Sequence, residues 1–126
     1  YPQNKFVANF IGDANVVKAE ILDKQSNSYD LKIAEMKIKV NSAKDFEKTV
    51  SVALRPEKIL INKDKKENSI HATVNNASFV GSSYQYILNS DAGKLFVISG
   101  ETNDVYKVGE EVFLSINEEE VKILND

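Results

Sequence analysis

Apolar and polar residues alternate along most of this chain, and that period of two constrains its fold more strongly than any other feature. From Asn15 to Ile123 the alternation recurs in about nine or ten short segments, which polar stretches separate. Successive side chains of a strand point to opposite faces, so each segment would bury one side and expose the other. Short strands at this spacing are typical of sandwiches and small barrels. The pattern predicts one all-β domain over residues 15–126, and no internal repeat is visible in it.

The first residues break this pattern. The stretch "KFVANFIG" places its apolar residues along one stripe of a helix and ends on a glycine, a common helix terminator: Phe6, Val7, Phe10, Ile11 and Gly12. A helix of about two turns is not stable alone in water, so packing must hold it. We therefore expect one short helix within residues 1–14, with its apolar stripe buried against another part of the protein.

Composition narrows the chemistry that this chain can perform. It has no cysteine, which excludes disulfides, thiolate nucleophiles and cysteine-bound zinc. The formal net charge is −3 and the basic residues are not clustered, which disfavours binding to the phosphates of a nucleic acid. No apolar run approaches the roughly 20 residues that cross a bilayer. These features favour a globular domain with no nucleic-acid partner.

Catalytic motifs are absent from the sequence. It contains no phosphate-binding glycine loop, no dinucleotide fingerprint and no nucleophile elbow. The single histidine, His71, lies between Ile70 and Ala72 and should therefore point to the surface. The sequence predicts no catalytic residue, no metal site and no bound cofactor in this chain.

The stretch "ALRPEKILI" contains the only arginine. Pro56 fixes its own φ angle and pushes Arg55 toward extended geometry, so the strand that begins near Val50 should end here, before Glu57. A guanidinium offers five donors in a rigid fork, which suits a carboxylate or a set of backbone carbonyls. We favour a structural role, in which Arg55 fixes this corner, over a ligand-binding role.

Four stretches together resemble the C-terminal TOBE domain of ATP-binding subunits of ABC importers, and the resemblance covers nearly the whole chain. They are "YPQNKFVANFIGDANV", "ALRPEKILI", "FVGSSYQY" and the closing "VGEEVFLSINEEEVKIL". Within that family the pattern is most similar to the ATPases of spermidine/putrescine importers. Importers of ferric iron, sugars, phosphonates or molybdate share much of it and are the alternatives.

The resemblance implies an OB-like β-barrel related to molybdate-binding domains, with residues 1–14 as the linker helix from a nucleotide-binding domain. ATP and Mg²⁺ would belong to that other domain, so this chain alone would not be an enzyme. The expected partners are a second ATPase subunit, in a homodimer, and the importer's membrane subunits, on the cytoplasmic face of the membrane. The residues expected to serve structure or interfaces are Phe6, Val7, Phe10, Ile11, Gly12, Asn15, Arg55, Pro56, Glu57, Phe79 and Gly81.

A binding module is the second hypothesis. The barrel would sense a small ligand such as a polyamine or an oxyanion, or would bind single-stranded nucleic acid as other OB-like barrels do. A polyammonium ligand requires converging carboxylates and an aromatic face. The acids that could contribute are Glu101, Asp104, Glu110 and Glu111. Scattered surface acids are the competing explanation, and we rank nucleic acid lowest because the basic residues are dispersed.

Overall fold

The computed structural model describes residues 14–42, 44–101 and 103–124. Its ten strands confirm the all-β prediction. They are β1 (Asn15–Lys24), β2 (Ser28–Ile33), β3 (Met36–Asn41), β4 (Thr49–Leu54), β5 (Leu60–Asn62), β6 (Ile70–Val80), β7 (Ser83–Ser90), β8 (Gly93–Ser99), β9 (Glu111–Ser115) and β10 (Val121–Ile123). Two single-turn 3₁₀ helices, η2 (Pro56–Lys58) and η3 (Glu118–Glu120), precede β5 and β10.

The predicted N-terminal helix lies outside the described residues, and with it Phe6, Val7, Phe10, Ile11 and Gly12. Among the residues that the structure describes there is no α-helix, and the first regular element is β1.

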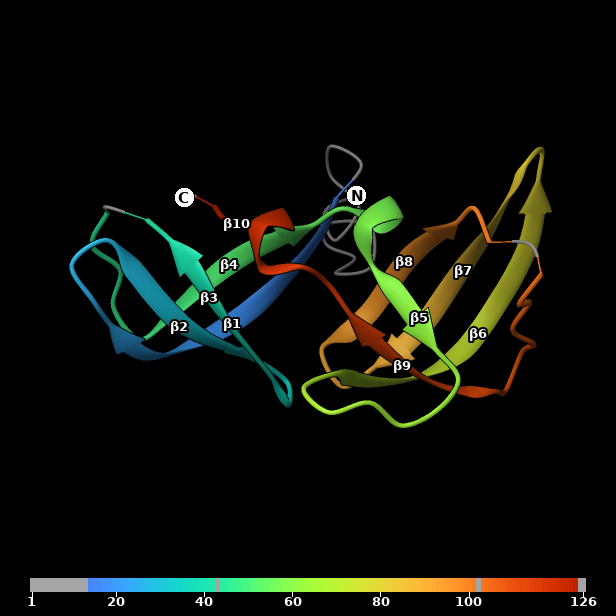
Figure 1. Ribbon diagram of the computed structural model, residues 1–126, viewed down its shortest axis with the longest axis horizontal. Helices are drawn as coiled ribbons and strands as arrows, with labels where there is room; N and C mark the ends of the chain where they lie inside the picture. Colours follow the sequence, from blue (N-terminus) through green and yellow to red (C-terminus); the bar gives the residue numbers. More distant parts are fainter. Residues whose placement is uncertain (1–13, 43, 102, 125–126) are drawn as a thin grey trace, which may run out of the picture.

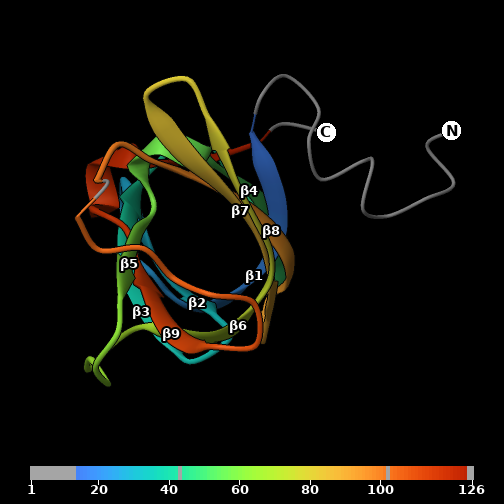
Figure 2. The same ribbon diagram turned by 90° about the vertical axis from the view of Figure 1, so that its right-hand side faces the viewer.

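The strands form two five-stranded antiparallel sheets, which lie side by side in Figure 1. Sheet A has the order β10-β4-β1-β2-β3, and sheet B has the order β5-β9-β6-β7-β8. Both are strongly curled, so the molecule looks like a ring when viewed end-on in Figure 2. The prediction of one OB-like barrel was therefore only partly right. Ten strands are shared between two open sheets, and no ladder between described strands closes either one.

The two halves of the chain contain the same order of strands and turns. Each half of the chain forms four strands of one sheet, then a 3₁₀ turn, then a short fifth strand that joins the other sheet. Thus β5 pairs with β9, whereas β10 pairs with β4. The sequence shows no internal repeat, but the structure repeats the same order of elements. The halves share burial pattern and topology but little residue identity, because many apolar residues fill equivalent core positions.

Local geometry is repeated as well. The amide of Lys58 donates to the Arg55 carbonyl at 3.0 Å, and the amide of Glu120 donates to the Asn117 carbonyl at 2.9 Å. In both turns the residue before the 3₁₀ helix is extended, with φ/ψ of −71°/133° at Arg55 and −69°/139° at Asn117. Each turn therefore ends a core strand and directs the chain to the opposite sheet.

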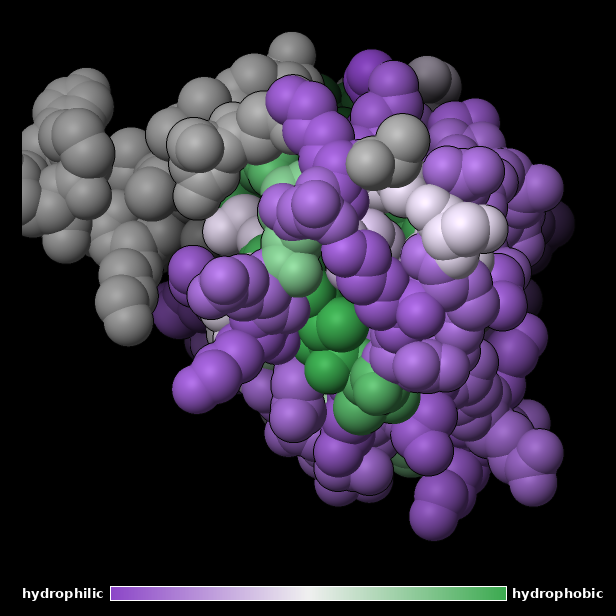
Figure 3. Space-filling model, turned by 90° about the vertical axis from the view of Figure 1, so that its left-hand side faces the viewer, coloured by the Kyte–Doolittle hydropathy of each residue, from purple (hydrophilic) through white to green (hydrophobic). Residues whose placement is uncertain are grey.

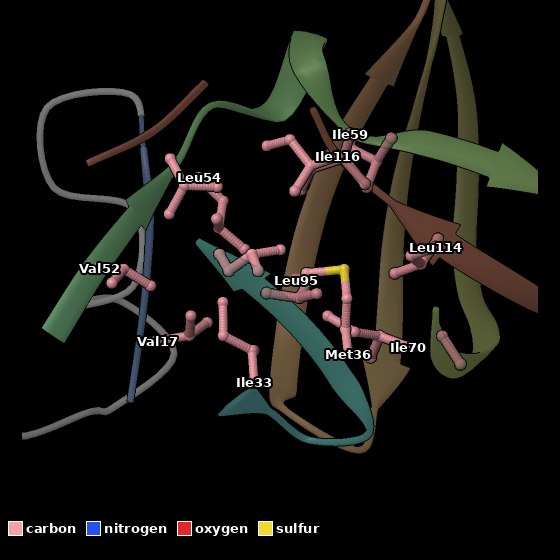
Figure 4. Close-up of a cluster of buried hydrophobic side chains, with 14 of the residues drawn as sticks. Val17, Ile33, Met36, Val52, Leu54, Ile59, Ile70, Leu95, Leu114 and Ile116 are labelled. Carbon is pink, nitrogen blue, oxygen red and sulfur yellow. The ribbon is translucent and has the colours of Figure 1, made fainter. Parts of the chain in front are cut away.

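One hydrophobic core holds both sheets together. Figure 4 shows Met36 of sheet A directed toward Ile70 and Leu95 of sheet B. Ile59 and Ile116, next to the two 3₁₀ turns, complete the same cluster. Because the core is continuous, neither half has an apolar interior of its own. We expect the two halves to unfold together.

The end of the molecule formed by sheet A is mostly hydrophilic on its surface. Figure 3 shows that end, with a narrow hydrophobic strip running between hydrophilic residues. Leu22 is the large apolar residue of β1 that is exposed, at 45%.

Candidate functional site

Asn15 joins the two sheets at the point where β1 begins. Its side chain is fully buried, and its Nδ2 donates to the carbonyls of Leu54 at 3.1 Å and Phe96 at 2.8 Å. Its Oδ1 accepts a hydrogen bond from the Phe96 amide at 2.8 Å. We use the term amide clip for such a pair of hydrogen bonds, in which one side-chain amide bonds both the N–H and the C=O of a single residue. A buried amide whose bonds are all made fixes the geometry around it, so Asn15 holds β8 against β1 and β4.

The second half of the chain has its own amide clip, which the sequence did not reveal. Asn68, shortly before β6, accepts from the Lys37 amide at 2.6 Å and donates to the Lys37 carbonyl at 2.8 Å. Asn15 thus clips β8, the edge strand of sheet B, and Asn68 clips β3, the edge strand of sheet A. Asn68 is exposed and has a φ of 55°, a left-handed conformation that asparagine tolerates. An asparagine before a strand was the only available signal, and that signal is weak.

Arg55 follows Leu54, the β4 residue that Asn15 contacts, and the next residue, Pro56, is buried. The guanidinium is exposed, and among residues 14–42, 44–101 and 103–124 no carboxylate or carbonyl accepts a hydrogen bond from it. The corner is instead fixed by Pro56 and by the bond from the Lys58 amide to the Arg55 carbonyl. A role for the Arg55 side chain therefore stays a prediction that requires a partner beyond these residues.

A groove of about 400 Å³ opens between β5, η2 and the end of β8. Glu57, Glu101 and Asp104 line it together with Lys66, and the side chain of Tyr106 is part of its lining. A neighbouring hollow of about 440 Å³ shares Asp104 and Tyr106 with the groove. Two of the four acids predicted to face a ligand therefore lie in one groove, and Glu57 joins them.

Tyr106 anchors the connection between β8 and β9 beside this groove. Its hydroxyl donates to the Ile61 carbonyl at 3.2 Å, and its amide donates to the Tyr86 hydroxyl at 3.2 Å. The two rings meet edge to face, with centroids 5.8 Å apart. Burial raises the pKa of both Tyr86 and Tyr106. Both hydroxyls therefore stay protonated at neutral pH, and the Tyr106 hydroxyl needs its proton to donate to the Ile61 carbonyl.

Glu110 and Glu111 lie outside the groove lining and have other partners. Glu110 accepts from the Lys107 amide at 2.9 Å and lies 3.7 Å from the ammonium of Lys63. The Glu111 carboxylate is 3.1 Å from Nε2 of His71. Within the described residues, no group of three or more histidine or carboxylate side chains is arranged to hold a metal ion. The four acids do not form one site.

Comparison with known proteins identifies the family. Residues 52–124 match the family model described as the TOBE domain. The chain belongs to the TOBE domain family. Relatives of this TOBE domain are named Fe(3+) ions import ATP-binding protein FbpC. The protein from Fusobacterium nucleatum is 26% identical over 130 residues, which cover 99% of this chain and 34% of the relative.

Two further relatives with the same name support that match. The protein from Brucella suis is 21% identical and the one from Agrobacterium fabrum 23% identical, each over 98% of this chain and 35% of the relative. The TOBE domain thus spans about a third of the length of these relatives. The spermidine/putrescine prediction gains no support from them, because their names refer to ferric iron.

The solved structure of the cytoplasmic molybdate-binding protein ModG shares the fold of this TOBE domain. It superposes with a TM-score of 0.71 at 14% identity, covering 90% of this chain and 96% of ModG. At that identity the likeness concerns the fold alone. It agrees with the molybdate-binding type of fold expected from the sequence. Within the described ranges of the TOBE domain, no helix has the length and hydropathy that crossing a bilayer requires.

The hairpin between β6 and β7 projects from sheet B of the TOBE domain (Figure 2). Phe79 is 56% exposed near its tip, and its ring centroid lies 5.0 Å from that of Tyr84. Gly81 occupies the turn with a φ of 69°, a conformation that favours glycine. The structure places these two predicted interface residues on a projecting surface, apart from the groove lining.

Proposed function

We propose that this TOBE domain is a regulatory and dimerisation domain of the ATP-binding subunit of an ABC importer that transports ferric iron. The observation that carries the proposal is similarity along 98–99% of the chain to proteins named as ferric-iron import ATP-binding proteins. Polyamine, sugar, phosphonate and molybdate importers are the alternatives. The subunit would act at the cytoplasmic face of the membrane.

The domain would contribute no catalytic group of its own. Among the described residues no group of three or more histidine or carboxylate side chains is arranged to hold a metal ion, and the groove has three carboxylates to one lysine, which disfavours phosphate. ATP and Mg²⁺ would bind to a separate nucleotide-binding domain, with a second ATPase subunit and the membrane subunits as partners.

The amide clip of Asn15 offers a mechanical route for regulation. Asn15 is the first residue of β1 and is bonded to backbone groups of both β4 and β8. Movement of any domain attached before Asn15 would therefore act on both sheets together, because the core and the clip make them one body. In this proposal the domain works as a rigid element that couples subunits.

Uptake by cells tests the substrate. The gene for the whole subunit would be deleted and then restored, and uptake of radiolabelled iron and of radiolabelled spermidine would be compared. We expect restoration of iron uptake only. Recovery of spermidine uptake without iron uptake would refute the ferric-iron assignment and support the polyamine alternative.

Two measurements on the isolated chain test the remaining claims. Its ATP hydrolysis should not exceed background, and light scattering should detect weak self-association at high concentration. Hydrolysis above background would overturn the non-catalytic role. A strictly monomeric chain at millimolar concentration would overturn the dimerisation role.

A second candidate function rests on the groove itself. Glu57, Glu101 and Asp104 line it with a single lysine, Lys66, and this excess of carboxylates suits a small organic cation and disfavours an oxyanion or a nucleic acid. Titration with spermidine and with molybdate, followed by amide chemical shifts, would test it. Saturable shifts at these residues that persist in 0.3 M salt would support the cation, whereas shifts that salt abolishes would indicate nonspecific attraction.

A further inference from the structure

The groove described above lies between the two edge strands of sheet B. Sheet B ends in β5 on one side and in β8 on the other. Residues 59–62, in and just before β5, line the groove together with residues 98–100 at the end of β8. An edge strand presents backbone groups that have no neighbouring strand to pair with. The groove can therefore offer backbone hydrogen bonds from both of its sides.

The corresponding edge of sheet A is capped by side chains. Asn68 bonds both the N–H and the C=O of Lys37. A carboxylate oxygen of Glu118 accepts a hydrogen bond from the Lys39 amide at 3.0 Å. Glu118 is the first residue of η3, whereas the first residue of η2 is Pro56, whose side chain has no hydrogen-bond acceptor. Pro56 therefore cannot cap an edge of sheet B in the way that Glu118 caps β3.

On the β8 side, the backbone of Ile98 is open to pairing. Asn15 bonds the N–H and C=O of Phe96, so these groups point away from β7, the neighbour of β8 in the sheet. Backbone direction alternates along a strand, and the N–H and C=O of Ile98 therefore point the same way. Within residues 14–42, 44–101 and 103–124, neither group of Ile98 has a hydrogen-bond partner.

On the β5 side, one group of Ile61 is open as well. Its C=O accepts the Tyr106 hydroxyl at 3.2 Å and so points away from β9, the strand that β5 pairs with. The N–H of the same residue points in the same direction. No acceptor for this N–H exists in the part of the chain that the structure describes. The two edges thus present two N–H donors and one C=O acceptor.

The side chains of the groove determine the charge that an occupant must have. Glu57, Glu101 and Asp104 line it with a single ammonium, that of Lys66. This excess of carboxylates attracts a positively charged occupant. The volume of about 400 Å³ is near the lower end of the roughly 300–1,000 Å³ that ligand pockets enclose. The groove therefore fits a small cation or a short basic segment of a protein.

The open backbone groups distinguish these two occupants. A protonated amine such as spermidine has hydrogen-bond donors only, and it cannot bond the N–H groups of Ile61 and Ile98. An extended peptide supplies a carbonyl to each N–H and an N–H to the Ile98 carbonyl, as in the addition of a strand to a sheet edge. The peptide satisfies the backbone and the carboxylates together.

We propose that the groove binds an extended segment of a partner protein that contains lysine or arginine. The segment pairs with the edges of β8 and β5, and its basic side chains lie beside Glu57, Glu101 and Asp104. Sheet A is capped by its own side chains, whereas sheet B is completed by the partner. This inference goes beyond the proposed function and does not rest on the transported substrate, since it concerns a protein contact at the groove.

Amide hydrogen exchange in the presence of a synthetic peptide tests the proposal. The probe is the capped heptapeptide Thr-Lys-Val-Lys-Val-Lys-Thr, which has as many positive charges as spermidine. In about 0.15 M salt we expect saturable binding that slows exchange of the Ile61 and Ile98 amides at least tenfold. Exchange of the Lys37 and Lys39 amides should not change, because side chains already bond them. Spermidine at the same concentration should slow none of the four amides.

Charge and backbone pairing are tested separately. The double variant Glu57→Gln/Glu101→Gln should bind the heptapeptide at least fivefold more weakly. The matched control, Glu119→Gln/Glu120→Gln, removes the same charge from η3, the equivalent turn of sheet A, and should leave the affinity unchanged. A heptapeptide with methyl groups on its central backbone nitrogens keeps its charge but cannot pair as a strand. It should bind at least tenfold more weakly than the unmethylated peptide.

Each of the other outcomes would overturn the proposal. Equal binding of the methylated peptide, or an equal loss of affinity in the control variant, would indicate attraction by charge alone. Absence of heptapeptide binding at millimolar concentration would exclude strand addition at the groove. Exchange at Ile61 and Ile98 that slows with protein concentration alone would indicate that a second copy occupies the groove. The uptake assay does not involve the groove, so a failure there and a failure here are distinguishable.

Discussion

The two halves of this domain share a framework, and one hydroxyl group distinguishes their matching tyrosine contacts. In each half a tyrosine of the second strand accepts a hydrogen bond from the loop before the fourth strand: Tyr29 from the Phe46 amide at 3.0 Å, and Tyr86 from the Tyr106 amide at 3.2 Å. The ring pairs match too, with centroids 5.6 and 5.8 Å apart. Tyr106, unlike Phe46, has a hydroxyl, which bonds to the exchanged strand β5. This hydroxyl therefore attaches the loop before β9 to β5, beside the groove.

Core truncations in the two halves should have the largest effects and would test whether the halves are one unit. Leu31 and Leu88 occupy matching positions and are both fully buried. We expect Leu31→Ala and Leu88→Ala each to destabilise by about 3 kcal/mol, since each leaves a cavity in the shared core. Urea unfolding followed by tyrosine fluorescence and by circular dichroism should give coincident single transitions for both variants. Two separated transitions would show that each half has its own core.

The two amide clips should differ in energy. Asn15→Ala removes the buried bond to the Leu54 carbonyl and two part-buried bonds to the backbone of Phe96, and we expect a loss of about 2 kcal/mol. The exposed clip is removed without backbone strain by Asn68→Gly, because glycine accepts its φ of 55°. Water replaces its partners, so that change should cost less than about 1 kcal/mol. Equal costs in urea unfolding would refute the distinction between a buried and an exposed clip.

Removing the Tyr106 hydroxyl would make the second half resemble the first. Tyr106→Phe should lower stability by about 1 kcal/mol through loss of the bond to the Ile61 carbonyl. Amide hydrogen exchange in β5 should become faster, whereas exchange in β2 and β3 should not change. Tyr84→Phe serves as the control, since its ring stacks at 6.0 Å on Tyr86 without a bond to β5. Unchanged exchange in β5 would contradict the anchoring role.

The sequence could predict the strands because alternation records burial directly, and it also predicted the strand end at Pro56. It could not predict the exchange of β5 and β10, because a three-residue strand pairs equally well with either sheet by pattern alone. The convergence of Glu57, Glu101 and Asp104 was hidden for a related reason. These acids come from separate loops, and only the path of the chain brings them to one groove.

Alkaline pH should have the smallest effect on stability, and it concerns the second half. Burial raises the pKa of Tyr86 and Tyr106 above the value of about 10 that tyrosine has in the unfolded chain. The folded state therefore holds these protons more tightly, so their contribution is fully present below pH 10 and is lost as the pH rises through the folded values. We expect the free energy of unfolding to be constant from pH 7 to 9 and to fall above pH 10. Tyr106→Phe should make that fall shallower, because one of the two raised groups is gone. If its pH dependence equals that of the unmodified chain, burial of Tyr106 does not couple to stability and the hydroxyl contributes only its hydrogen bond.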